Sequence, residues 1–148
     1  MPTAAEIKKA LREAGIEVYR TLGDVVYLAD RPRENLLMET GVSVRSVAPL
    51  GTAVRVGFVV RAQRSDFPHD GEDQLFARAS GLAAAAVPRG YREAAREARK
   101  LVDAGDSERV DTSCEVAYEI DVEDLDAAIV EARFALALEK VAAPSRSS

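Results

Sequence analysis

The sequence has little of several residue types from which small proteins build sites. Cys114 is the only cysteine, His69 is the only histidine, and tryptophan is absent. One cysteine excludes an intramolecular disulfide and fits a reducing compartment, so we expect a cytoplasmic protein. No paired C-x-x-C and no H-E-x-x-H occurs, which removes the common zinc motifs.

Long apolar runs are also missing. The purely apolar runs, such as Leu82–Val87, extend over only a few residues, whereas a membrane-spanning helix needs about 20. The beginning of the sequence has no apolar segment of the secretory type. We therefore expect no membrane span, no secretory signal and no membrane partner.

The composition is that of a globular protein. The 148 residues are 47% hydrophobic and 30% charged, with a net charge of −5. This length predicts one domain with a real core, which we place at residues 1–142, followed by a frayed tail at 143–148. The negative charge argues against binding of nucleic acid over the whole surface. Arginine exceeds lysine and Asn35 is the only asparagine, which suggests a GC-rich bacterial gene.

Two β-type runs between Gly41 and Gln63 form the centre of the predicted fold. In the second run, one face carries the apolar residues Val54, Val56, Phe58 and Val60. Alternation with a period of two is typical of a strand with one buried face. The intervening Pro49-Leu50-Gly51 has turn chemistry. The two runs are expected to pair as an antiparallel hairpin.

The remaining elements follow from helical and strand periodicity. Thr3 and Glu6 form a capping box that begins a helix at about residues 4–14. The other expected elements, in chain order, are strands at 16–22 and 24–30 around Gly23, a short helix at 32–39, a helix capped by Asp70 and interrupted at Pro88, a second helix at 91–102, a strand at 111–120, and a final helix whose N-cap is Asp121. This order predicts an α+β fold: an antiparallel sheet of about five strands, covered by helices on one face, with helices at both ends.

Two resemblances accompany this order of elements. It is similar to that of roadblock-type regulatory modules. The small size, the acidity and the amphipathic final helix are similar to those of type III secretion chaperones. No motif residue supports either family, and the helical segment at 70–105 departs from the simplest pattern of both, so neither is used to assign a function.

The histidine lies in an acidic loop, where a metal site is the first possibility to weigh. Asp66, Asp70, Glu72 and Asp73 surround His69 in the sequence, and carboxylates with an imidazole can bind a divalent cation. The spacing matches no calcium loop. We therefore favour a solvated loop before an acidic helix start, and predict no metal and no cofactor.

Four arginines have spacings of 3, 4 and 3 residues: Arg89, Arg92, Arg96 and Arg99. On a helix they would form a basic stripe that could contact phosphate groups or nucleic acid. Glu93 and Glu97 stand among them at helical salt-bridge spacing, and no aromatic residue interleaves the stripe for base stacking, since Tyr91 would lie on the apolar side of the helix. A salt-bridged solvent face is the favoured interpretation, and nucleic acid is not expected as a partner.

Signals of catalysis are few. Cys114 falls on the apolar face of its predicted strand, and no nearby histidine in the sequence could activate its thiol. The motifs G-x-S-x-G, Walker A and G-x-G-x-x-G do not occur. We name no catalytic residue, and the sequence favours a non-enzymatic protein.

The final helix carries more apolar surface than one contact needs. Ile129, Phe134, Leu138 and Val141 are the candidate interaction residues. The leading hypothesis is a cytoplasmic binding or regulatory module that acts through protein–protein contacts, as a homodimer or with another protein. An alternative is a small-molecule-binding protein or cofactor-poor enzyme. Its pocket would lie between sheet and helices near Tyr27, Phe58 and Tyr118, with the 64–74 loop as a lid.

Overall fold

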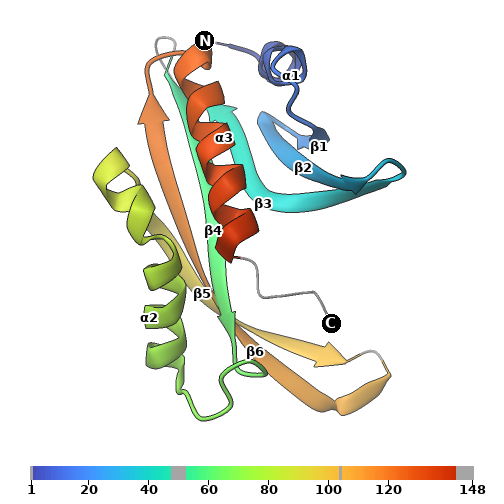
Figure 1. Cartoon of the computed structure of the whole chain (residues 1–148), viewed down its shortest axis with the longest axis vertical. Helices are drawn as coiled ribbons and strands as arrows, with labels where there is room; N and C mark the ends of the chain where they lie inside the picture. The colour runs from blue at the N-terminus through green and yellow to red at the C-terminus, as the bar shows by residue number, and fades with distance from the viewer. Residues whose placement is uncertain (1, 48–52, 104, 143–148) are drawn as a thin grey trace. The chain divides into compact units, whose positions relative to one another are not determined.

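The computed structural model describes residues 2–47, 53–103 and 105–142. In these residues, six strands form one antiparallel sheet in the order β1-β2-β3-β4-β6-β5 (Figure 1). The strands are β1 (Val18–Leu22), β2 (Val25–Arg33), β3 (Leu36–Ser46), β4 (Val54–Gln63), β5 (Arg92–Asp103) and β6 (Asp106–Val122). The helices are α1 (Ala4–Glu13), α2 (Glu72–Leu82), a 3-10 helix η1 (Ala84–Arg89) and α3 (Leu125–Ala142). The predicted α+β class is confirmed, with six strands where about five were expected.

The chain divides into two compact units. One comprises Met1–Phe58 and Glu119–Ser148, and the other comprises Val59–Tyr118. The single domain predicted for residues 1–142 stays a prediction. The tail at 143–148 and the Pro49-Leu50-Gly51 turn lie outside the described residues.

The first unit is a sheet covered by α1 and α3. Alternate residues of its strands, such as Val26, Leu28, Val42 and Val44, are fully buried. Ile7 and Leu11 of α1 are buried too. The buried residues of α3 include three alanines: Ala128, Ala132 and Ala135. Because alanine side chains are short, α3 can approach β3 closely, and the Glu139 carboxylate reaches the Gly41 amide at 3.0 Å.

The second unit contains α2, η1, β5 and parts of β4 and β6. Its buried residues include Val60 and Ala62 of β4, Leu75 and Ala79 of α2, and Cys114 and Val116 of β6. The Arg64 amide donates to the Thr112 carbonyl at 2.9 Å. This bond and the Arg61–Glu115 ion pair at 3.8 Å fix the register of β4 against β6.

Three local predictions are confirmed. The Thr3 hydroxyl accepts from the Glu6 amide at 3.1 Å, and the Glu6 carboxylate accepts from the Thr3 amide at 3.3 Å. β1 and β2 form the hairpin expected around Gly23, whose φ of +61° suits glycine. Val54, Val56, Phe58 and Val60 are buried on β4, and β3 pairs with β4 antiparallel.

The short helix predicted at 32–39 is wrong. Residues 25–33 and 36–46 are strands, and Arg33 pairs with Leu36 across a tight turn. β1 is short, and its pairing with β2 ends where Val18 meets Leu28. Pro32 therefore lies on a part of β2 without a β1 neighbour, where a missing amide hydrogen is tolerated.

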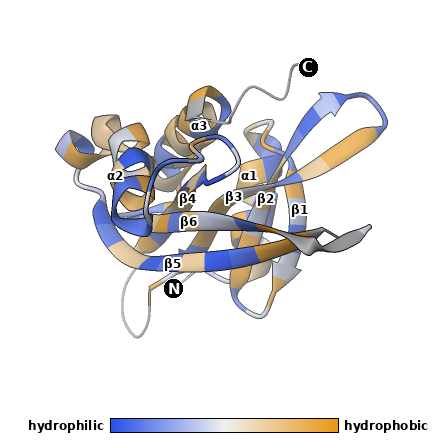
Figure 2. Ribbon diagram, turned by 90° about the horizontal axis from the view of Figure 1, so that it is seen from below, coloured by the Kyte–Doolittle hydropathy of each residue, from blue (hydrophilic) through white to orange (hydrophobic). Residues whose placement is uncertain are grey.

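The helix predicted at 91–102 is also wrong, because this segment is β5 at the end of the sheet. Every residue from Arg92 to Val102 is exposed, so neither face shows the apolar alternation of a half-buried strand. Charged bands alternate with alanine bands along it (Figure 2). Charged residues on an edge strand oppose pairing with other chains.

Two predicted helix caps are displaced. α2 begins after Gly71, and Asp70 instead pairs with Arg78. α3 begins at Leu125, and the Asp124 carboxylate accepts from the Ala127 amide at 2.9 Å. Asp124, and not Asp121, therefore caps the final helix.

Candidate functional site

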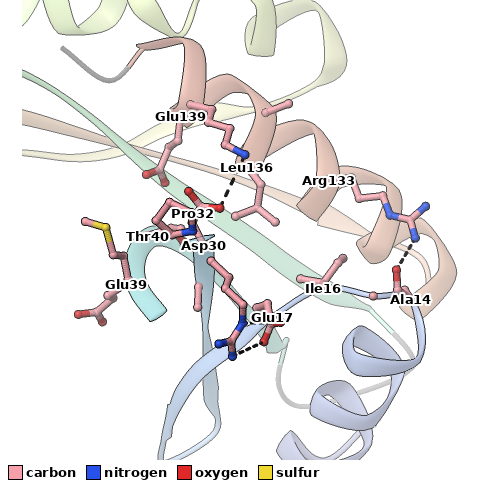
Figure 3. Close-up of a pocket in the computed structure, with 16 residues that line it drawn as sticks. Ala14, Ile16, Glu17, Asp30, Pro32, Glu39, Thr40, Arg133, Leu136 and Glu139 are labelled. Carbon is pink, nitrogen blue, oxygen red and sulfur yellow. Dashed lines mark hydrogen bonds and ion pairs between the residues drawn. The ribbon is translucent and has the colours of Figure 1, made fainter. Parts of the chain in front are cut away.

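A groove of about 710 Å³ lies within the first unit (Figure 3). Three parts of the chain form it: the link between α1 and β1, the β2–β3 hairpin near Pro32, and the second half of α3. The groove exists because β1 is short and leaves the end of β2 uncovered. Its size is within the range of small-molecule sites.

The groove has an apolar lining. Ile16 and Ala29 are buried, and Met38 and Leu136 are half-buried. Leu136 lies between the charged groups at the two ends of the groove (Figure 3). Apolar side chains in a concave surface favour a ligand with an apolar part.

Most charged groups around this lining are neutralised by a neighbour. Arg31 donates from Nε to Glu17 Oε1 at 3.0 Å and from Nη1 to the Glu34 carbonyl at 2.7 Å. Lys140 Nζ lies 3.7 Å from Asp30 Oδ1. Glu39 lies 3.3 Å from an Arg20 nitrogen.

Arg133 differs from these cations. Its Nη2 donates to the Ala14 carbonyl at 2.7 Å. Among the described residues, no carboxylate lies within ion-pair distance of its guanidinium. Ala14 is the C-cap residue of α1, so the helix end holds this arginine at one end of the groove (Figure 3). The guanidinium has five N–H donors, and most of them stay available for an anion.

The opposite end of the groove is acidic. Glu139 Oε1 accepts from the Gly41 amide at 3.0 Å. The Thr40 hydroxyl donates to the Leu28 carbonyl at 2.9 Å and accepts from the Val42 amide at 3.1 Å. The groove thus combines an apolar lining with a cation at one end and carboxylates at the other.

The residues of the predicted pocket do not line this groove. Tyr27, Phe58 and Tyr118 are absent from its walls, and Phe58 and Tyr118 are buried. The 64–74 loop contributes no wall residue either. Sequence reasoning missed Arg133, Leu136 and Ile16, because they come from segments far apart in the chain and belong to no motif.

The loop that holds His69 is tied down by other residues. Asp111 accepts from the Ser65 amide at 3.0 Å and from its hydroxyl at 2.7 Å. Arg78 pairs with Asp70, and its guanidinium carbon lies 3.9 Å from the centre of the Phe67 ring. Within the described ranges, no three acidic, histidine or cysteine side chains gather as a metal site. The structure therefore does not bring His69, Asp66, Asp70 and Asp73 together as ligands.

The four arginines do not form a helical stripe. Arg89 lies in η1, and the other three lie on β5. Arg92 and Arg96 share one face of the strand, and Arg99 points to the other face. Arg96 pairs with Glu93, and Arg99 lies 3.7 Å from Glu115. The ion pairing expected for this segment is present, although on a strand.

Cys114 is fully buried in the second unit. Burial is the main cause that raises the pKa of its thiol, the charge of Glu72 raises it further, and Arg64 opposes both. A raised pKa disfavours the nucleophilic thiolate. The environment of Cys114 is that of a structural thiol.

The candidate interaction residues of α3 do not share one side of the helix. Val141 is 85% exposed, and Ile129, Phe134 and Leu138 are half-buried. Helix geometry places Ile129 about 140° around the axis from Phe134. Val130, which is 56% exposed, lies instead on the same side as Phe134. It was missed, although its spacing of four residues from Phe134 gave a signal.

Comparisons with protein-family models, curated proteins and solved structures found no match. Within the described residues, no helix combines the length and the apolar character needed to cross a membrane.

Proposed function

We propose that the protein is a cytoplasmic binding module that associates with a second copy of itself through α3. The observation that supports this proposal is the outer strip of α3, which we define as Val130, Phe134, Leu138 and Val141. Their spacings of 4, 4 and 3 residues place them on one side of the helix. No charged residue interrupts the strip, and Val130 and Val141 are largely exposed.

A second copy fits this strip by symmetry and by charge. A two-fold interface uses the same patch on both copies. In an antiparallel pair of helices, each helix start lies beside the end of the other, which suits the two dipoles. Asp126 in the first turn and Lys140 in the last turn flank the strip on one side. The antiparallel arrangement would set each Asp126 near Lys140 of the second copy, in addition to the exposed Lys140–Asp30 pair at 3.7 Å within each copy.

Sedimentation velocity over a range of protein concentrations tests the proposal. We expect a monomer–dimer equilibrium in the wild type and a dimer Kd raised at least about tenfold in Val130→Asp, because a buried charge disfavours the interface. Val87→Asp is the matched control, since Val87 is 58% exposed and lies on η1. A monomeric wild type would refute self-association.

Two other outcomes are also informative. Equal dimerisation of the Val130→Asp and Val87→Asp variants would place the interface away from the outer strip. Native mass spectrometry of protein from its own host would show whether a different chain, and not a second copy, occupies the surface. Either result contradicts the proposal as stated.

A further inference from the structure

We propose that the groove in the first unit binds a small amphiphilic carboxylate, with the carboxylate at Arg133 and the apolar chain along Leu136. This inference does not depend on self-association. Leu136 lies about 120° around α3 from Val130 of the outer strip, so the apolar lining of the groove and the strip occupy different sides of the helix.

The charge of the ligand follows from the pairing of groups around the groove. Arg31 is neutralised by Glu17, and Lys140 by Asp30. Arg133 is the groove cation whose described partner is a neutral carbonyl, that of Ala14. The other N–H donors of Arg133 are therefore best satisfied by a negatively charged group of a ligand.

The geometry of arginine favours a carboxylate over other anions of similar size. The planar guanidinium fork matches the two oxygens of a carboxylate in a bidentate pair. The bond to Ala14 uses one donor of Nη2 and holds the fork in place. Such positioning before binding lowers the entropic cost of capturing the anion.

The apolar part of the ligand follows from the lining. Ile16 and Ala29 form a buried base, and Met38 and Leu136 are half-buried beside it. A chain of several methylene groups would cover the exposed parts of Met38 and Leu136 at the same time as it removes its own carbons from water. Acetate offers the same head group without this contribution and would bind much more weakly. The carboxylates at the far end, including Glu139, disfavour a second negative charge on the ligand.

Octanoate is the probe, followed by two-dimensional amide NMR of the full chain, with acetate and octylamine as ligand controls. We expect octanoate to shift the Gly15 and Thr40 amides in the groove and to bind with a Kd of about a millimolar or tighter. Acetate should shift these amides little, and octylamine should bind more weakly than octanoate, because the carboxylates at the far end already have partners. Shifts that fall mainly outside the groove, or equal binding of octylamine, would overturn the proposal.

Arg133→Gln supplies the protein-side test. It should raise the octanoate Kd about tenfold, as expected for loss of a charged hydrogen-bonding partner. Arg133→Lys, which keeps the charge but not the fork, should bind with intermediate affinity. Arg12→Gln removes an exposed cation of α1 outside the groove and should leave the Kd within twofold. An unchanged Kd in Arg133→Gln refutes the assignment. If Arg133→Gln does not fold, the octanoate Kd of Arg133→Lys and the amide shifts of the wild type test the assignment instead.

Discussion

Arg55 on β4 donates two hydrogen bonds to Asp121 on β6, from Nε to Oδ1 at 2.7 Å and from Nη2 to Oδ2 at 3.1 Å. The side chains are only 21% and 33% exposed. Glu119 lies 3.7 Å from the same guanidinium. The bonds to Asp121, and then the charges of both carboxylates, raise the pKa of Arg55. This fork joins neighbouring strands of the first unit in one register.

Asp121→Asn should lower the free energy of unfolding by about 1 kcal/mol, because a bidentate pair of opposite charges becomes a contact between the Arg55 cation and a neutral amide. Urea denaturation measures the change. Asp24→Asn, at the exposed β1–β2 turn, is the matched control and should change stability little. A double-mutant cycle with Arg55→Gln isolates the pair. Additive effects of the two substitutions would show that the fork contributes nothing to stability.

Glu93 should titrate below its ordinary pKa of 4.5. A hydrogen bond from Arg96 is the main cause, and the arginine charge adds to it, while slight desolvation opposes both. The depressed pKa means that the pair stabilises the fold above the unfolded pKa, and that this effect is lost as the pH falls through the folded pKa. Because both side chains are exposed, the effect on unfolding should be small and sensitive to salt.

Carboxyl-detected NMR measures the Glu93 pKa directly. The titration should run from about pH 2 to about pH 7, which spans the ordinary pKa of a glutamate side chain. Arg96→Gln should return it toward 4.5. An identical pKa in the wild type and the variant would show that the ion pair does not persist in solution.

Features that depend on neighbours in the sequence were predictable. The Thr3–Glu6 capping box needs only two side chains three residues apart, so its pattern is visible without a fold. Gly23 gives a similar local signal, because a two-residue hairpin turn demands a residue that tolerates positive φ.

Features that depend on tertiary pairing were not predictable from the sequence. The alanine, arginine and glutamate residues of 91–102 favour a helix in isolation. Pairing with β6 overrides that preference, and the exposed position of β5 leaves no burial pattern to reveal the strand. Pro32 led to the wrong prediction of a short helix for a similar reason. It is tolerated in β2 because β1 does not pair with that part of the strand, and this depends on where β1 ends.

The groove could not be read from the sequence for a related reason. Ile16, Pro32 and Arg133 reach it from three separate segments, and each is an ordinary residue in its own segment. What distinguishes Arg133 is a missing carboxylate neighbour among the described residues. Such an absence is visible only once the fold has placed the groups around it.

Cys114 should react slowly with thiol reagents in the folded protein. Burial raises the pKa of its thiol above the ordinary 9.0, and the charge of Glu72 acts in the same direction. At pH 8, alkylation by iodoacetamide should be at least about a hundredfold slower in buffer than in urea, because the reagent must wait for an opening of the second unit. Mass spectrometry of quenched samples gives both rates, and Cys114→Ser provides the blank.

The raised pKa of the Cys114 thiol also predicts how the stability of the fold changes at alkaline pH. As the pH rises above 9.0, the thiol ionises in the unfolded chain before it ionises in the fold. The free energy of unfolding should therefore fall between pH 9.0 and the higher pKa of the folded thiol. Cys114→Ser should lack this component of the alkaline loss. Glu72→Gln should lower the folded pKa and so narrow the pH range over which this stability is lost. Rapid labelling of the native wild type at pH 8 would contradict the burial of this side chain.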